Sequence, residues 1–259
     1  MKVIGLTYAT SDFAPYAALL AASSRKAGVD EFTVYTPADI DPEFRHQHRQ
    51  ILDAQRGAGY WLWKPLLIAQ TLRVALEGDL VLWVDAAAHF AGPVNGIVEA
   101  IDRAGLDILL MGEGFTESAF TKRDTFIGLD ADEPAITDSP QRFASCIAVR
   151  NTASSREFID RYLAACSDPR LITDAANVMG ADNYADFRDH RHDQSILSIL
   201  SKQARIPVIP NGLVAEGLSP PGSQVINHTR RHVSATQVLT HLLAHGLATT
   251  EDLAAMRLQ

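Results

Sequence analysis

The chain has 259 residues, of which 47% are hydrophobic and 21% charged, and its formal net charge is −8. These values are ordinary for a globular protein and supply a core for one large α/β domain or two small ones. An acidic chain is a poor partner for nucleic acid or an anionic membrane unless its basic residues cluster. The basic cluster at 228–232 is short, so it suits a diphosphate better than a polymer.

The cysteines and the N-terminus indicate the compartment. Cys146 and Cys166 have neither the spacing of a metal-binding pair nor the number needed for a disulfide framework, so two buried, reduced thiols are expected. The first residues read as a strand rather than a signal peptide. No apolar run approaches the roughly 18 residues that span a bilayer. These features predict a cytoplasmic protein.

Strand-like and helix-like segments alternate along the chain, which predicts an α/β domain. The first strand, helix and second strand form a strand–helix–strand unit, with the helix ended by Gly28. Ser154 is a candidate cap for its helix. Strands are expected at 2–8, 32–35, 80–84, 107–111, 144–150 and 206–209. Helices are expected at 13–27, 62–76, 94–104, 154–165, 195–203 and 235–256, the last interrupted near Gly246. Residues 112–139 read as a long loop, and such loops are often functional.

The first strand leads into the loop Thr7-Tyr8-Ala9-Thr10-Ser11. The loop lacks the Gly-rich fingerprint of dinucleotide-binding proteins, and the chain contains no Walker-A pattern. Tyr8 is suited to stacking on a base, and Thr7 and Thr10 to bonding its edge. A helix cap by Ser11 or Asp12 is compatible with this interpretation.

Asp85 follows the apolar strand 80–84 and precedes three alanines. Open α/β sheets bind their ligands at the carboxyl ends of strands. A carboxylate among small residues leaves room for a phosphate and for Mg²⁺ or Mn²⁺, which favour oxygen ligands. A simple turn cap fits Asp85 equally well.

The order of these features resembles a bacterial glycosyltransferase with the GT-A fold, in which an aromatic-Lys-Pro helix precedes a strand that ends in Asp. Residues 59–65, Gly-Tyr-Trp-Leu-Trp-Lys-Pro, are similar to a segment of surface-polysaccharide enzymes of this kind, and the resemblance covers about 3–232. It implies a single GT-A-like, Rossmann-like domain with a mixed, mainly parallel central sheet flanked by helices. The nucleotide-binding half would be about 1–112, and the acceptor and sugar half about 113–259.

GT-A enzymes bind Mn²⁺ and the donor diphosphate through Asp-X-Asp, of which Asp85-Ala86-Ala87 keeps the first Asp. The residues around His228 resemble family-8 retaining glycosyltransferases, in which a His near the C-terminus is a further metal ligand. The resemblance implies that Asp85 and His228 hold Mn²⁺ or Mg²⁺ and that Arg230 and Arg231 contact phosphate. A solvated basic loop is the competing interpretation.

The same families open a helix on the sugar side of the site with an Asp-Gln pair, which His192-Asp193-Gln194 resembles. The resemblance implies that Asp193 and Gln194 are catalytic, that His192 contacts the donor and that transfer retains anomeric configuration. Negative charge or oxygen dipoles help an oxocarbenium-like centre. A helix cap by Asp193 is the alternative, although five consecutive polar residues, 189–193, exceed what a cap requires.

Five further side chains are candidates. A basic residue in the long loop often reaches the donor in GT-A enzymes, which implies such a role for Lys122 or Arg123, with a solvated charge run as the alternative. Lys64 lies between Trp63 and Pro65, so this segment either contacts the donor or fixes a helix start. Gln141 and Ser145 stand where an acceptor pocket is expected.

Together these features predict an enzyme that moves a sugar from a nucleotide-diphosphate donor, expected to be a UDP-sugar, to a hydroxyl of a saccharide or glycoconjugate. Polysaccharide or glycoconjugate synthesis is the expected setting. Two alternatives stay open. A nucleotidyltransferase would show a Gly-rich basic loop after the first strand, which this chain lacks. A catalytically silent sugar-nucleotide-binding or scaffold protein is favoured by the reduced motif at Asp85.

Overall fold

The computed structural model describes residues 1–209, 213–222, 224–229 and 233–250 and confirms the predicted mixed α/β architecture. A six-stranded sheet has the order β2-β1-β3-β8-β5-β9. Strand β8 is antiparallel to both neighbours, and the other pairs are parallel. The strands are β1 (Val3–Tyr8), β2 (Glu31–Tyr35), β3 (Leu80–Val84), β5 (Ile108–Met111), β8 (Cys146–Arg150) and β9 (Val208–Ile209).

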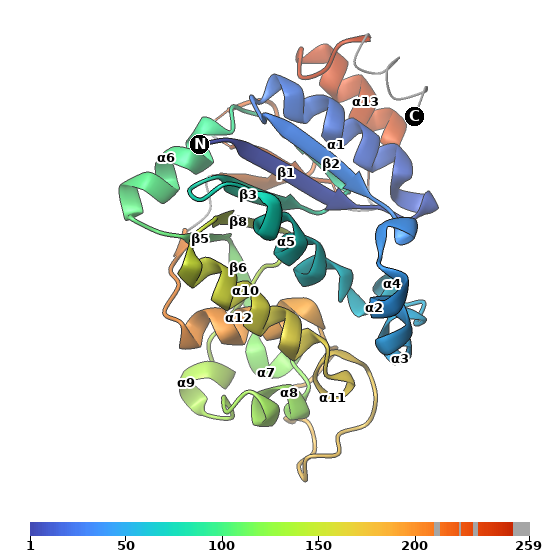
Figure 1. Cartoon of the computed structure of the whole chain (residues 1–259), viewed down its shortest axis with the longest axis vertical. Coiled ribbons are helices and arrows are strands. Elements are labelled where there is room, and N and C mark those ends of the chain that lie inside the picture. Colours follow the sequence, from blue (N-terminus) through green and yellow to red (C-terminus); the bar gives the residue numbers. More distant parts are fainter. Residues whose placement is uncertain (210–212, 223, 230–232, 251–259) are drawn as a thin grey trace.

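Apolar side chains on both faces of this sheet are buried, as continuous apolar strands predict. On β3, Val81 and Trp83 enter one core, and Leu82 and Val84 enter the other. Helices α5, α10 and α12 supply residues to the first core, and α1 and α6 to the second (Figure 1). The longer helices are α1 (Ala14–Lys26), α5 (Trp63–Val74), α6 (Asn95–Ala104), α10 (Ala153–Cys166), α12 (Asp193–Gln203) and α13 (Ala235–Ala244).

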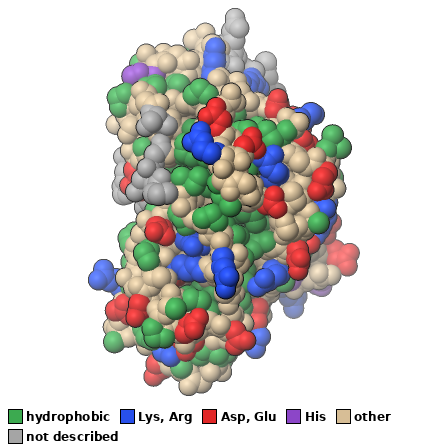
Figure 2. Space-filling view, turned by 90° about the vertical axis from the view of Figure 1, so that its left-hand side faces the viewer, with side chains coloured by type: hydrophobic (Ala, Val, Ile, Leu, Met, Phe, Trp, Pro, Cys, Tyr) green, Lys and Arg blue, Asp and Glu red, His purple; other side chains and the backbone are tan. Residues whose placement is uncertain are grey.

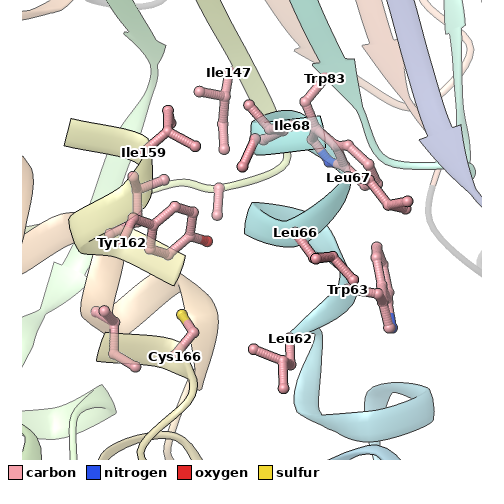
Figure 3. Packing of buried hydrophobic residues seen from close by; sticks show 14 of the residues in the cluster. Leu62, Trp63, Leu66, Leu67, Ile68, Trp83, Ile147, Ile159, Tyr162 and Cys166 are labelled. Carbon is pink, nitrogen blue, oxygen red and sulfur yellow. The ribbon is translucent and has the colours of Figure 1, made fainter. Parts of the chain in front are cut away.

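The first core lies between α5 and α10, and Figure 3 shows Leu66 on α5 opposite Tyr162 on α10. Tyr162 is fully buried, and its hydroxyl donates to Asp193 at 3.2 Å, so this core extends to the predicted catalytic pair. Both cysteines are free and buried, as predicted. Burial raises the pKa of the Cys146 and Cys166 thiols, which keeps them protonated and unreactive.

A second sheet, β10-β11-β4, brings a late part of the chain to the end of β3. It consists of β4 (Ala88–Phe90), β10 (Val214–Glu216) and β11 (Ile226–His228). In the antiparallel register His228 is opposite Ala88, three residues after Asp85. The pairing therefore places His228 beside the reduced Asp-X-Asp segment.

The structure corrects three sequence-based expectations. The predicted loop 112–139 contains a strand and three short helices. The cap of α10 is Thr152, paired with Ser155 in a capping box, and not Ser154. Helix α13 ends at Ala244, which agrees with the interruption predicted near Gly246 but leaves residues 247–249 outside a helix; residues 251–259 lie outside the described part of the chain. The shorter elements are α2 (Pro42–Gln47), α3 (Arg49–Leu52), α4 (Gly57–Tyr60), β6 (Glu113–Thr116), α7 (Glu117–Phe120), α8 (Arg123–Gly128), α9 (Pro134–Thr137), β7 (Pro140–Arg142) and α11 (Pro169–Ile172), with 3₁₀ turns at Ser11–Phe13 and Pro37–Asp39.

The face of the molecule in Figure 2 shows acidic and basic side chains interspersed around a hydrophobic strip. Over the described residues, every helix is too short or too polar to cross a lipid bilayer.

We expect acid to destabilise the fold through His89 on β4. Burial lowers the pKa of this fully buried imidazole to about 4. The unfolded chain therefore binds the extra proton between about pH 6.5 and 4, and stability falls as the pH falls through this window. The loss from this residue is about 3 kcal/mol, at ~1.4 kcal/mol per unit of pKa. Urea unfolding of His89→Gln across this range should show a correspondingly shallower dependence on pH.

The matched control is His46→Gln, at an exposed histidine of α2, which should reproduce the wild-type pH profile. A His89→Gln profile as steep as that of the wild type would contradict the assignment.

Candidate active site

Three cavities meet at Asp85 and Trp61, which line all of them. The nucleotide-sized cavity, of about 800 Å³, extends from Asp85 toward the end of β1. The inner cavity, of about 150 Å³, is lined by Lys64 and Asp193. The aromatic cavity, of about 330 Å³, is lined by His228 and two phenylalanines. Asp85 therefore lies where a ligand extending through more than one cavity would pass.

The nucleotide-sized cavity joins the end of β1 to the segment before α5. Tyr8 stacks on Trp63 with ring centroids 4.1 Å apart and an interplanar angle of 17°, and both residues line this cavity with Thr10. Arg45 and Gln55 add polar groups to the wall. Aromatic surface with a few polar groups is the usual lining of a small-molecule site. Thr7, by contrast, is fully buried within β1.

The turn before α5 is the least regular backbone near these cavities. Ala58, Tyr60 and Trp61 all have left-handed backbone, with φ of 50°, 49° and 61°. A Cβ at Gly59 (φ 102°) would lie 2.8 Å from Leu52 Cα, so glycine is required there. Non-glycine residues in this conformation store strain, which is typical of functional sites.

The strained turn places the Trp61 indole over the ring of His192, with centroids 5.4 Å apart and an interplanar angle of 24°. Trp61 was not among the site residues predicted from the sequence. The run Gly57-Ala58-Gly59 shortly before it could have indicated the irregular turn that places it there. His192 is itself almost fully buried, and its Nδ1 is 2.8 Å from the carbonyl oxygen of Ile172. His192 lines the inner cavity, and its ring also contacts that of Tyr60, with centroids 4.9 Å apart.

Lys64 is the centre of a buried ionic cluster, which we call the Lys64 cluster: Lys64, Asp85 and Asp193. The Lys64 ammonium lies 2.8 Å from Asp193 Oδ2 and 3.3 Å from Asp85 Oδ1, and it donates to the Ala144 carbonyl at 3.1 Å. Its side chain is 3% exposed, and that of Asp85 is 37% exposed. Lys64 thus pairs with both Asp85 and Asp193 from the protein interior and does not project into solvent.

Burial and charge oppose each other in the Lys64 cluster. Burial lowers the pKa of Lys64, but the two carboxylates outweigh it and leave the pKa above the ordinary value. The residue is therefore a cation at neutral pH. Burial raises the pKa of Asp193, and the adjacent ammonium opposes that rise. The Lys64 ammonium thus stabilises the desolvated Asp193 carboxylate beside the inner cavity.

Asp85 Oδ1 accepts from Trp83 Nε1 at 2.8 Å and lies 3.3 Å from the Lys64 ammonium, and among the described residues no hydrogen bond or ion pair uses Oδ2. Oδ2 is therefore the oxygen suited to a ligand in the cavities. His228 lines the aromatic cavity together with Asp85. The structure thus brings both predicted metal ligands to one cavity. In the described part of the chain, no group of three or more His, Cys, Asp and Glu side chains could hold a metal ion.

A carboxylate and an imidazole fit a divalent cation that takes its other ligands from a diphosphate and water. Arg230 and Arg231, the predicted phosphate contacts, lie outside the described residues.

Gln194 lines both the inner and the aromatic cavity, as does Ser145. The Gln194 side chain accepts from the Ala144 amide at 3.3 Å and donates to Gln141 Oε1 at 2.7 Å. Gln141 is fully buried, and its own amide donates to the buried Glu117 at 3.1 Å. Ser145 thus faces two of the three cavities, whereas Gln141 contacts Gln194 from the protein interior.

The structure does not bring Lys122 and Arg123 to Asp85. Lys122 is buried beside a separate depression of about 280 Å³, and its ammonium donates to the Ala175 carbonyl at 2.7 Å. The Arg123 guanidinium pairs with Asp132 at 2.8 Å and lies 4.0 Å from the centre of the Tyr184 ring. Both charges are thus used within their own part of the fold.

The comparisons with known proteins concern the fold. No protein-family model matches the chain, and no curated protein matches its sequence. The solved galactosyltransferase LgtC, in complex with donor and acceptor sugar analogues, is 13% identical with a TM-score of 0.51, and the match covers 95% of this chain and 96% of that one. The bifunctional glycosyltransferase WbbM is 9% identical with a TM-score of 0.50, over 88% of this chain and 46% of that one. Mouse xyloside xylosyltransferase 1 is 11% identical with a TM-score of 0.47, over 89% and 98%. The likeness to LgtC and WbbM shows that this chain has the GT-A glycosyltransferase fold.

Proposed function

We propose that the protein transfers a sugar from a nucleotide diphosphate, a UDP-sugar, to a hydroxyl of a saccharide or glycoconjugate. The observation that carries this proposal is the convergence of Asp85, Asp193 and His228, far apart in the sequence, on adjoining cavities. LgtC, which shares the fold, was solved with donor and acceptor sugar analogues. The cavities around Asp85 offer separate space for a nucleoside, a donor sugar and an acceptor.

In this proposal the nucleoside occupies the nucleotide-sized cavity, against Tyr8 and Thr10. The diphosphate lies at Asp85, and the donor sugar enters the inner cavity beside Asp193 and Gln194. This division corresponds to a nucleotide-binding half over about 1–112 and an acceptor and sugar half over about 113–259. The larger cavity, of about 800 Å³, thus takes the nucleoside, and the smaller, of about 150 Å³, takes the donor sugar.

Transfer forms a bond between the acceptor oxygen and the anomeric carbon. The bond from that carbon to the diphosphate oxygen breaks, its electron pair leaves on the diphosphate, and the acceptor's proton departs with the nucleoside diphosphate. Asp193 places negative charge beside the carbon as positive charge develops there, and Gln194 adds an oxygen dipole. We propose retention of anomeric configuration on the resemblance of this pair to retaining enzymes.

Asp85 and His228 would hold Mn²⁺ or Mg²⁺ together with the donor diphosphate. Such an ion supplies positive charge to the leaving group. Lys64 has a separate part in this proposal: its ammonium holds the Asp85 carboxylate in place, 3.3 Å away, and partly neutralises it before any ligand binds. The chain's own residues therefore fix the geometry of the diphosphate end of the cleft.

The proposal is tested by measuring UDP release from UDP-glucose and UDP-galactose with a mixed saccharide acceptor pool, with and without Mn²⁺ or Mg²⁺. We expect turnover that needs the metal and falls at least about 10-fold in Asp85→Asn, because the variant loses the carboxylate that would hold the ion at the leaving diphosphate. The anomeric configuration of the product, read by proton NMR, tests retention. A nucleotide sugar should also raise the melting temperature.

The control is Asp160→Asn, which removes an exposed carboxylate on α10 that pairs with Arg73; it should leave turnover unchanged. Binding of nucleotide sugars without turnover would favour a silent binding protein. Pyrophosphate release from a nucleoside triphosphate and a sugar phosphate would favour a nucleotidyltransferase. If the protein neither binds nor turns over any nucleotide sugar, the proposed function is refuted.

A further inference from the structure

The aromatic cavity adjoins the inner cavity along one wall. The two share Asp85, Ser145, Gln194 and Arg191, as well as Trp61. If the donor sugar lies in the inner cavity, the space across this wall is where a second substrate must present its hydroxyl. The inference therefore rests on the proposed function.

Phe115 lines the aromatic cavity, although both its exposure and its backbone conformation are unfavourable for a large apolar residue. Its side chain is 49% exposed, and its φ of 62° is an outlier for a bulky residue. It lies where the β6–β7 register shifts between Gly114 and Thr116, and such bulges re-aim side chains. Strain of this kind costs roughly 1–3 kcal/mol and persists at ligand sites.

Phe115 is part of an aromatic wall. Its ring centre lies 6.2 Å from that of Phe143, which also lines the cavity, and 4.7 Å from that of Phe120. A sugar ring presents an apolar C–H face that packs on such surfaces, with its hydroxyls left for polar groups at the edges. The wall thus suits a pyranose ring better than an extended polar chain.

Arg191 adds a positive charge above this wall. Its guanidinium lies 5.0 Å from the Phe120 ring centre and 5.9 Å from that of Phe115, and the side chain is 43% exposed. The carboxylate beside it, Asp189, is 3.8 Å away. Both Asp189 oxygens already accept from Arg56, at 2.7 and 2.9 Å. The charge of Arg191 is therefore only partly compensated.

Asp85 on the same cavity does not supply the missing charge. Its carboxylate pairs with Lys64 at 3.3 Å, and this ammonium, which also pairs with Asp193 at 2.8 Å, neutralises it in part. A planar guanidinium on a partly enclosed aromatic surface is well suited to bidentate binding of a carboxylate.

We propose that the acceptor is an acidic saccharide, in which a sugar ring packs on Phe115 and Phe143 and its carboxylate pairs with Arg191. The acceptor hydroxyl then faces the wall shared with Gln194 and Asp85. Arg191 would be an acceptor-specificity residue, distinct from the residues that hold the nucleotide.

The test compares p-nitrophenyl β-glucuronide with p-nitrophenyl β-glucoside, which share a pyranose ring and differ at C6, where a carboxylate replaces a hydroxymethyl group. Binding is measured by calorimetry with UDP present. The wild type should bind the glucuronide at least about 10-fold more tightly, as a charge-assisted bidentate contact implies. Arg191→Gln should abolish that preference, and Phe115→Ala should weaken both ligands.

The matched control is Arg103→Gln, at an exposed arginine of α6, which should leave the preference intact. Equal binding of the two saccharides by the wild type, or binding of neither, overturns the proposal. So does a fall in UDP affinity in Arg191→Gln with the preference retained, since it would place Arg191 at the diphosphate. Failure of the wild type to bind UDP would instead refute the proposed function.

Discussion

Replacing Asp193 with Asn is expected to lower kcat for sugar transfer by at least about 100-fold, the usual scale for losing one preorganised electrostatic contact. The side chain is 5% exposed and lies at the inner cavity, so its charge acts where water screens it weakly. Asparagine keeps the shape and removes the charge. Because the contact acts on charge that develops during reaction, KM for the donor should change little.

Steady-state kinetics of Asp193→Asn with the best nucleotide sugar would measure kcat and KM separately. The Asp160→Asn variant again serves as the control, because it removes a carboxylate from the surface of α10. Full activity of Asp193→Asn would remove Asp193 from the catalytic site. An increase in donor KM with kcat unchanged would make it a binding residue only.

The second large effect is expected from Lys64→Met, which should lower the free energy of unfolding by about 3–5 kcal/mol. Removing one partner of a buried ion pair leaves the other charge uncompensated, and this is the usual cost. The penalty should fall mainly on Asp193, whose side chain is 5% exposed, because Asp85 is 37% exposed and can be hydrated. Urea unfolding would measure it as a shift in midpoint at constant m-value.

A double variant separates the charge effect from lost packing. Lys64→Met with Asp193→Asn should be more stable than Lys64→Met alone, since the stranded carboxylate is gone, and the cycle gives the coupling energy. Lys26→Met, at an exposed residue of α1, should change stability by no more than about 0.5 kcal/mol. Additive effects of the two buried substitutions would show that Lys64 and Asp193 are not coupled.

Most long elements could be predicted from the sequence because each carries its own periodic pattern. The run Leu80–Val84 is buried on both faces of the sheet, and its uninterrupted apolar residues predicted that directly. The segment 112–139 was misjudged because its helices are only one or two turns long, which is too short for a hydrophobic period to appear. Their folding depends on contacts with α12, such as the ion pair of Glu117 with Lys202.

The sequence alone determined that a carboxylate, Asp85, ends a buried strand and that polar residues precede α12, because these are local properties of the chain. The tertiary structure decided which of these groups meet. It placed Lys64 between Asp85 and Asp193, kept Lys122 and Arg123 away from them, and brought Arg191 above Phe115. The packing of α10 against α5 and α12, and of α12 against β7, sets these distances, and such long-range contacts leave no periodic signal along the chain.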